Sequence, residues 1–352
     1  MQARANQQSL LSRYESVRII GQGLAGSLLA LQLKELEIPF VVQDIPRPGC
    51  ATSVAPGIVN PLAGRNFSPP KYIDDLFEQL HVAMGMVENA LGESIWTPCP
   101  ILRMFSDPTQ IDRLESSLQK KESTEYVSDR REANSYSYLN DDFGSFVTEQ
   151  AGWANLPIFK SRMRKMLDES GLLIEEEWTP DYQPSSKGRE LVVFCEGWHS
   201  ENNPIWSFIP HNPAKGEMIV VRFEEPIPRD RIYNQSCWVQ PIGEDSWRVG
   251  ATYSWSAFDS EPTLDGAEKL QENLSLLTSV PFHVEDQIAG VRPIVDDYKP
   301  VVGQHPENKD WFILNAMGSK GVLQTPTAVK DLVDHLVEGS RIPSEWSVDR
   351  FS

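Results

Sequence analysis

Short apolar runs, separated by glycines and a proline, open the chain after a polar start. Residues 16–20 (SVRII) are typical of a buried strand, and residues 24–36 are nearly continuous in Leu and Ala, which predicts a buried helix. A second apolar run at residues 40–42 ends just before Asp44. A strand, a helix and a strand with short links predict the opening of a doubly wound α/β fold.

The pattern then changes twice along the chain. Residues 98–150 are polar and charged, which favours an inserted or peripheral segment, whereas residues 155–169 and 191–194 predict a helix and a buried strand. Between residues 216 and 252, apolar residues such as Trp247 and Val249 alternate with polar ones, as in half-buried antiparallel strands. The chain ends with a strand at 311–314 and a helix predicted to begin near Thr325–Pro326, because Thr caps helices and Pro suits their first position.

We therefore predict two domains, as a length of 352 residues also favours. The first is an α/β, doubly wound, Rossmann-like domain built from residues 16–95, 150–205 and 285–352. The second is a smaller α+β substrate domain with an antiparallel sheet, built from residues 96–149 and 206–284. Residues 1–15 are expected to form a disordered tail.

Charge narrows the choice of partner. The formal net charge of −18 repels phosphates at long range and favours cations or zwitterions, so nucleic acid is an unexpected partner. The simpler interpretation of this negative charge is an acidic surface that only maintains solubility. Nowhere is an apolar run long enough to cross a bilayer, and we expect a cytoplasmic protein.

The spacing of cysteines and histidines indicates whether the chain binds a metal and whether its thiols are free or oxidised. The four cysteines, Cys50, Cys99, Cys195 and Cys237, form no CxxC pair and suit free thiols in a reducing cytoplasm. The six histidines form neither an HxH nor an HExxH arrangement, so we predict no catalytic metal.

A glycine motif lies between the first strand and the first helix. Gly21, Gly23 and Gly26 fit the GxGxxG fingerprint, in which the glycines allow a tight turn, close approach to a pyrophosphate and close packing of helix on strand. Asp44 ends the second strand, where a carboxylate can accept hydrogen bonds from ribose hydroxyls. The motif predicts a dinucleotide but does not by itself distinguish FAD from NAD.

Further segments distinguish the two, because they resemble a known family in the order that the family requires. They are T52-S-V-A-P-G57-I-V-N-P61, V192-V-F-C-E-G197-W, P213-A-K-G-E217, G290-V-R-P-I-V-D-D-Y-K-P-V-V-G303 and A316-M-G-S-K-G-V-L-Q-T-P326. Together they resemble the FAD-dependent D-amino acid oxidase superfamily. The resemblance implies FAD as cofactor and oxidation of the C–N bond of a small amine or amino acid.

Two members of that superfamily share further elements with the chain. Glycine oxidase resembles it at Lys215–Glu217, Gly250–Thr252 and Gly290–Pro293. The oxidase half of the bifunctional enzyme that completes 5-methylaminomethyl-2-thiouridine in tRNA is similar at Gly250–Tyr253 and at the turn Gly318–Gly321. That enzyme also carries a methyltransferase, which has no counterpart in this chain.

The resemblance also implies site residues. Arg292 is expected to bind a substrate carboxylate, since a guanidinium fits a carboxylate with two prongs, although a structural ion pair is the alternative. Trp238 lies where glycine oxidase places a tyrosine, and plain packing is its simpler role. Lys320 is expected near the flavin pyrimidine ring, unless it faces solvent, and Tyr253 with Trp255 forms either an aromatic wall or part of the sheet packing. The implied FAD contacts are Gly21, Gly23, Leu24, Ala25, Gly26, Asp44, Thr52, Ser53, Gly57, Ile58, Asn60, Gly197, Gly318, Ser319, Lys320, Gly321 and Val322.

The mechanism implied is transfer of a hydride from the substrate carbon to flavin N5, without a dedicated acid or base. Three alternatives stay open at this point. They are a standalone tRNA wobble-uridine side-chain oxidase, which would use the basic run at residues 160–165, a dehydrogenase with an acceptor other than oxygen, and a flavoprotein that has lost catalysis. The sequence leaves the amine and the oligomeric state open.

Overall fold

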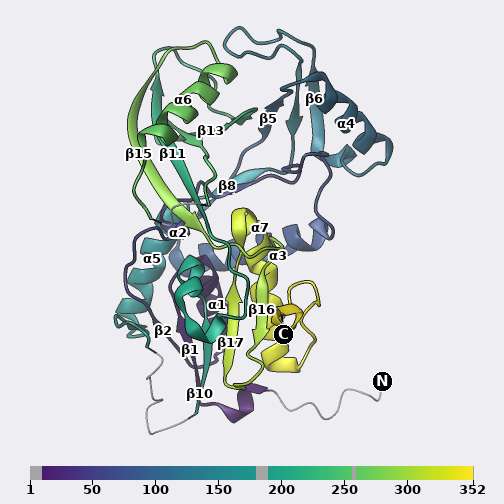
Figure 1. The fold of residues 1–352 in the computed structure, drawn as a ribbon. Coiled ribbons are helices and arrows are strands. Elements are labelled where there is room, and N and C mark those ends of the chain that lie inside the picture. Colours follow the sequence, from purple (N-terminus) through teal and green to yellow (C-terminus); the bar gives the residue numbers. More distant parts are fainter. Residues whose placement is uncertain (1–9, 180–188, 256–258, 352) are drawn as a thin grey trace.

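The computed structural model describes residues 10–179, 189–255 and 259–351. A six-stranded sheet occupies the lower half of Figure 1, in the order β16-β17-β10-β1-β2-β9. All its pairings are parallel except that of β16 with β17. Its strands are β1 (Ser16–Ile20), β2 (Phe40–Gln43), β9 (Leu173–Ile174), β10 (Glu190–Phe194), β16 (Val301–Gln304) and β17 (Trp311–Asn315). Because β2 and β10 lie on opposite sides of β1, the carboxyl ends of β1 and β10 form the switch point at which such sheets bind ligands.

Helices cover one face of this sheet. They are α1 (Leu24–Glu35), α3 (Ile73–Leu91), α5 (Leu156–Glu169) and α7 (Gly321–Glu338). Val17 and Ile19 of β1 point into the core shared with these helices, whereas Ile20 points to the opposite face. That opposite face is covered by short 3-10 helices, namely η3 (Gly197–Asn202), η4 (Pro204–Trp206) and η6 (Val348–Phe351).

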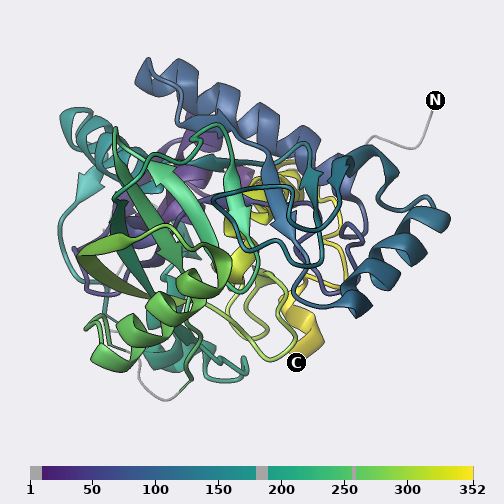
Figure 2. The ribbon, with the colours of Figure 1, turned by 90° about the horizontal axis from the view of Figure 1, so that it is seen from above.

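An eight-stranded sheet lies above the first, in the order β15-β11-β14-β13-β12-β5-β7-β6 (Figures 1 and 2). Only β12 and β5 pair in parallel, and this pairing joins the two separate stretches of chain that make the sheet. Helix α6 (Leu264–Leu277) packs on the outer face through Leu270 and Leu274. The strands are β5 (Ile101–Met104), β6 (Val127–Arg131), β7 (Ser145–Thr148), β11 (Ala214–Phe223), β12 (Ile232–Asn234), β13 (Trp238–Ile242), β14 (Ser246–Gly250) and β15 (Phe282–Arg292).

The remaining elements link strands and helices within each sheet or between the two sheets. A small three-stranded sheet has the order β3-β8-β4 and lies between them in the chain. These elements are α2 (Ala51–Val54), β3 (Ile58–Val59), β4 (Trp96–Pro98), α4 (Pro108–Gln119), η2 (Thr124–Tyr126), β8 (Gly152–Ala154) and η5 (Gly318–Lys320). No helix in the described ranges is both long and apolar enough to span a membrane.

The structure corrects two expectations at helix ends. The last helix begins at Gly321, not near Thr325–Pro326, because η5 leads straight into it. Thr325 donates its hydroxyl hydrogen bond back to the Gly321 carbonyl at 2.6 Å, so it lies inside the helix, where Pro326 removes one backbone donor. At the other end, residues 10–13 form 3-10 helix η1 (Leu10–Arg13), and Leu10 packs on the core. The disordered tail predicted for residues 1–15 is therefore wrong from residue 10 onward, and residues 1–9 lie outside the described part.

One predicted domain boundary falls inside an element. Strand β15 continues through residue 285 as far as Arg292, so the substrate-side sheet reaches further along the chain than expected. The reason is that residues 283–286 are all exposed in this edge strand, so no buried face imposes an alternating pattern on the sequence.

Candidate active site

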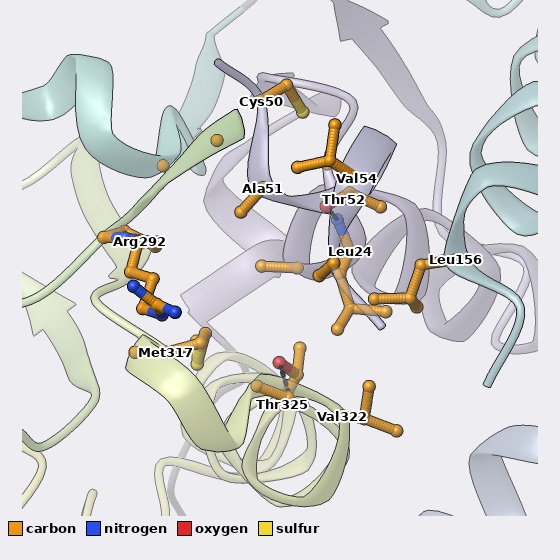
Figure 3. Close-up of a pocket in the computed structure, with 18 of the residues that line it drawn as sticks. Leu24, Cys50, Ala51, Thr52, Val54, Leu156, Arg292, Met317, Val322 and Thr325 are labelled. Atoms are coloured by element: carbon orange, nitrogen blue, oxygen red, sulfur yellow. Dashed lines mark hydrogen bonds between the residues drawn. The ribbon is translucent and has the colours of Figure 1, made fainter. Parts of the chain in front are cut away.

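A cavity of about 500 Å³ lies where the two sheets meet (Figure 3). One wall comes from the carboxyl ends of β1 and β10 and from the start of α7, at the switch point of the six-stranded sheet. The other wall is the face of the eight-stranded sheet that α6 leaves uncovered. Such a position is the one in which doubly wound folds bind dinucleotides.

The glycines of the first turn have distinct physical roles. Gly21 has φ +103, and a Cβ there would lie 2.5 Å from the Cys195 carbonyl oxygen. A Cβ on Gly26 would lie 2.0 Å from the Gly21 carbonyl oxygen, so this glycine permits helix α1 to pack on β1. A Cβ on Gly23 would meet only the Thr52 hydroxyl, at 3.4 Å, which leaves its backbone open to the cavity. These are the turn, packing and approach functions of the fingerprint.

Two polar side chains fix this loop. The Asp44 carboxylate accepts a hydrogen bond from the backbone N–H of Gln22 at 3.0 Å and forms an ion pair with Arg164 at 2.9 Å. The Thr52 hydroxyl accepts a hydrogen bond from the Leu24 amide at 3.0 Å, drawn as a dashed line in Figure 3. Asp44 therefore lies at the cavity with its charge partly balanced by Arg164.

The start of α7 forms another part of the wall. Gly318, with φ +58, turns the chain into η5, and Lys320 occupies the N-cap position of α7. Lys320, Gly321 and Val322 line the cavity, so the start of α7, where helix amides favour negative charge, lies at its wall, while Lys320 is also exposed to solvent. Met317 and Val322 close the wall beside them (Figure 3).

Most residues predicted from the sequence meet at this cavity. The lining includes Gly21, Gly23, Leu24, Ala25, Asp44, Thr52, Gly57, Ile58, Asn60, Trp238, Gly197, Arg292, Gly318, Ser319, Lys320, Gly321 and Val322. Four predicted residues are not part of it, namely Gly26, Ser53, Tyr253 and Trp255. Gly26 packs under the loop, and the Ser53 hydroxyl accepts a hydrogen bond from Lys160 at 2.9 Å.

Arg292 ends β15 with its guanidinium over the neighbouring strand. A Cβ on Gly216 of β11 would lie 2.4 Å from each terminal nitrogen of Arg292, so the missing side chain makes room for the guanidinium. These nitrogens donate weak hydrogen bonds to the Lys215 and Thr252 carbonyl oxygens at 3.3–3.4 Å, and the Tyr253 ring lies 4.7 Å away. Burial lowers the pKa of Arg292, and among the described residues no carboxylate pairs with it. The structural ion pair considered from the sequence is therefore absent from the described part of the chain.

Trp238 forms the floor beside this arginine. Its ring covers Gly250 of β14, where a Cβ would lie 2.4 Å from the ring. Met218 of β11 lines the cavity next to it and also approaches Gly250. Trp238 also packs against a buried cluster that includes Ile101 and Ile232, so packing and cavity lining are combined in one side chain.

Several lining residues were not found from the sequence. The rings of Trp198 and His199 lie with centroids 4.1 Å apart, tilted by 32°, and Trp198 Nε1 and His199 Nε2 have no hydrogen-bond partner among the described residues. Arg103 of β5 lines the same cavity. A charged residue inside the apolar strand I101-L-R-M104 was the available signal for it.

A family model described as FAD dependent oxidoreductase matches residues 16–335. The chain belongs to this family. The expectations of an FAD-dependent oxidoreductase of the D-amino acid oxidase type, of its Rossmann-like fold and of FAD as the cofactor of the family are thereby confirmed.

The curated relatives match only part of their own length. A glycine oxidase of Bacillus licheniformis is 30% identical over 38% of this chain and 37% of its own. The tRNA 5-methylaminomethyl-2-thiouridine biosynthesis bifunctional protein of Marinobacter nauticus is 23% identical over 92% of this chain and 56% of its own. The chain thus spans about a third to a half of the length of these relatives.

Solved structures resemble the whole chain in fold. Glycine oxidase from Geobacillus kaustophilus has a TM-score of 0.78 at 19% identity, covering 97% of this chain and 98% of its own. Iminodiacetate oxidase from Chelativorans has a TM-score of 0.75 at 20% identity, covering 96% and 98%. At such identities the likeness extends to the fold alone.

The residues around the cavity fit a dinucleotide. The open backbone at Gly23 and the amides at the start of α7 suit phosphate and the polar edge of a flavin. The ring nitrogens of Trp178, Trp198 and His199 have no hydrogen-bond partner among the described residues, and these side chains share the lining with Asp44, where an adenosine would supply acceptors and hydroxyls. Among the described residues no cluster of three or more metal-binding side chains occurs.

Proposed function

We propose that this protein oxidises the C–N bond of a small amine or amino acid that carries a carboxylate, producing an imine. The observation that supports the proposal is Arg292, a half-buried arginine on the cavity wall whose guanidinium is partly desolvated and has no carboxylate partner among the described residues. A buried charge that lacks a partner is costly, and a bound carboxylate would supply one.

The side chains around the cavity would promote the reaction by orienting the substrate and by excluding water. Arg292 would hold the substrate carboxylate, while Trp238 and Met218 would pack against the rest of the molecule and keep water out. FAD, when bound, would supply the two-electron acceptor for the hydride of the substrate carbon, and oxygen or another acceptor would then take up these electrons. The amine nitrogen loses its proton to solvent, and water then hydrolyses the imine to a carbonyl compound and the free amine. The reaction therefore requires no side chain of the protein to act as a general acid or base.

The alternative of a tRNA substrate requires a basic surface, and the cations of its candidate segment have partners within the chain. The run of residues 160–165 contains four cations, and each has a polar or acidic partner. Lys160 donates to Ser53, Arg162 pairs with Glu93 at 2.7 Å, Arg164 pairs with Asp44, and Lys165 lies 3.6 Å from Glu169. With three of its four cations paired to carboxylates, the helix offers less attraction to phosphates than its sequence suggests. A cytoplasmic location and the nature of the electron acceptor stay predictions.

The test is spectroscopic. The purified protein is loaded with FAD and titrated anaerobically with glycine, sarcosine, D-amino acids, proline and amines without a carboxylate. We expect flavin absorbance to bleach with a carboxylated amine, and Arg292→Lys to raise the concentration needed for half-bleaching. Recovery of absorbance on admission of air distinguishes an oxidase from a dehydrogenase. If no amine bleaches the flavin, or if Arg292→Lys leaves the half-bleaching concentration unchanged, the proposal fails.

A further inference from the structure

A second half-buried arginine lines the cavity from strand β5. Arg103 lies on β5 with its guanidinium 4.8 Å from the centre of the Phe67 ring, and it lines the same cavity as Arg292. Its Nε has no hydrogen-bond partner, and among the described residues its guanidinium has no ion pair. Burial lowers the pKa of Arg103 to about 10. The charge is therefore both desolvated and unbalanced.

The sheet places Arg103 in one row with the substrate wall. Arg103 pairs with Asn234 of β12, Asn234 with Trp238 of β13, Trp238 with Gly250 of β14, and Gly250 with Met218 of β11. Arg103, Asn234, Trp238 and Met218 all line the cavity. Arg103 thus lies on the same face of the sheet as the groups assigned to the substrate.

Charge is divided unevenly around the cavity. The acidic lining residues are Asp44, Glu176, Glu177 and Glu196, and all of them belong to the part built on the six-stranded sheet. The lining contributed by the described strands of the eight-stranded sheet contains two arginines and no acid. In a protein of net charge −18, this wall favours anions.

We propose that Arg103 binds a second anionic group of the substrate, so that the substrate is an extended amine with an acidic group at each end. This inference rests on the function proposed above. The Arg292 guanidinium covers Gly216 on β11, which is four strands from β5, or about 19 Å along the sheet at the usual strand spacing. Long arginine side chains shorten the gap, but a short amino acid spans too little of it to reach both.

The test uses the FAD-loaded enzyme and a homologous series. N-carboxyalkyl glycines of increasing chain length are compared with N-alkyl glycines of the same length, which lack only the terminal carboxylate. We expect the terminal carboxylate to lower KM about 10- to 100-fold at the best chain length. Arg103→Gln removes this advantage, and Arg103→Lys, which keeps the charge, retains part of it. Arg65→Gln is the matched control, because Arg65 is exposed and does not line the cavity.

Binding without turnover separates this inference from the proposed function. Linear dicarboxylates and monocarboxylates contain no amine, and their binding is followed through the flavin absorbance. If no amine reduces the flavin while dicarboxylates bind with a dependence on Arg103, the proposed function fails and the second anion site stands. If Arg103→Gln weakens N-alkyl and N-carboxyalkyl glycines equally, or if dicarboxylates bind as well without Arg103, the second anion site is wrong.

Discussion

Replacement of Gly216 by alanine tests whether the position of Arg292 determines catalysis. The new Cβ would lie 2.4 Å from both terminal nitrogens and 2.5 Å from Cζ of Arg292. An ordinary contact needs about 3.5 Å, so the guanidinium must retreat by about 1 Å. Since the obstacle is the end of a flexible side chain, the free energy of unfolding should change by no more than about 1 kcal/mol. A misplacement of about 1 Å in a group that orients substrate lowers kcat/KM by about 100-fold.

The assay compares Gly216→Ala with Gly85→Ala at saturating FAD. A Cβ on Gly85 of helix α3 meets nothing within 4 Å, so this variant should keep full activity and gain about 0.5–1 kcal/mol of stability. Flavin content and thermal unfolding are measured on both, and kcat/KM with the carboxylated amine that bleaches the flavin best. If Gly216→Ala keeps kcat/KM within about twofold of wild type while binding FAD, Arg292 does not orient the substrate from its present position. Loss of FAD instead would indicate that the sheet itself is distorted.

Three further predictions concern the cofactor, pH and the thiols. Asp44→Asn should weaken FAD binding about tenfold or more, because the ribose hydroxyls lose a charged hydrogen-bond acceptor. Quenching of flavin fluorescence measures the affinity, and an unchanged affinity would show that Asp44 does not bind the cofactor. Burial raises the pKa of Asp331 to about 6, so the folded state binds more protons than the unfolded state between about pH 4 and 6, and stability falls as pH rises through that window. Asp331→Asn should therefore be more stable than wild type at pH 7 and equal to it at pH 4 in urea unfolding, and a difference independent of pH would contradict this reasoning. Burial raises the pKa of Cys99 to about 11 and of Cys237 to about 12, and it also raises the pKa of Cys195. Only the half-buried Cys50 should therefore react with a thiol reagent in the native protein, and more slowly once FAD fills the cavity that Cys50 lines. A second cysteine that reacts fast would refute the burial argument.

The local pattern predicted the nucleotide half well, for a physical reason. Strand β1 was predicted at its observed bounds and helix α1 within one residue, because buried parallel strands and their helices show as uninterrupted apolar runs. The start of α7 was misplaced because Thr325–Pro326 has the chemistry of a cap, while the true start lies in a glycine turn whose geometry depends on β17 and η5. Local propensity is a weak guide where tertiary contacts set the backbone.

The substrate side was harder to predict, since its site depends on neighbours across strands. Arg292 was found through a motif, but the space that it fills is made by Gly216, on a strand distant in sequence. Arg103 was missed, because the parallel pairing of β5 with β12 that brings it to the cavity has no local signal. Tyr253 was expected at the cavity and instead packs against the side of the Arg292 guanidinium, outside the lining.

The way in which the chain passes between the sheets has a consequence for unfolding. Strand β15 belongs to the eight-stranded sheet along its whole length, yet its last residue lies at the cavity and leads within a few residues to β16 of the other sheet. The pairing of β12 with β5 likewise closes the upper sheet from stretches separated by helix α5 and by strands β9 and β10 of the lower one. Neither half is a continuous segment that could detach, melt or be released by a single proteolytic cut while the other remains native. The two sheets should therefore lose structure in one cooperative transition, and the geometry between cofactor and substrate groups should persist until that transition.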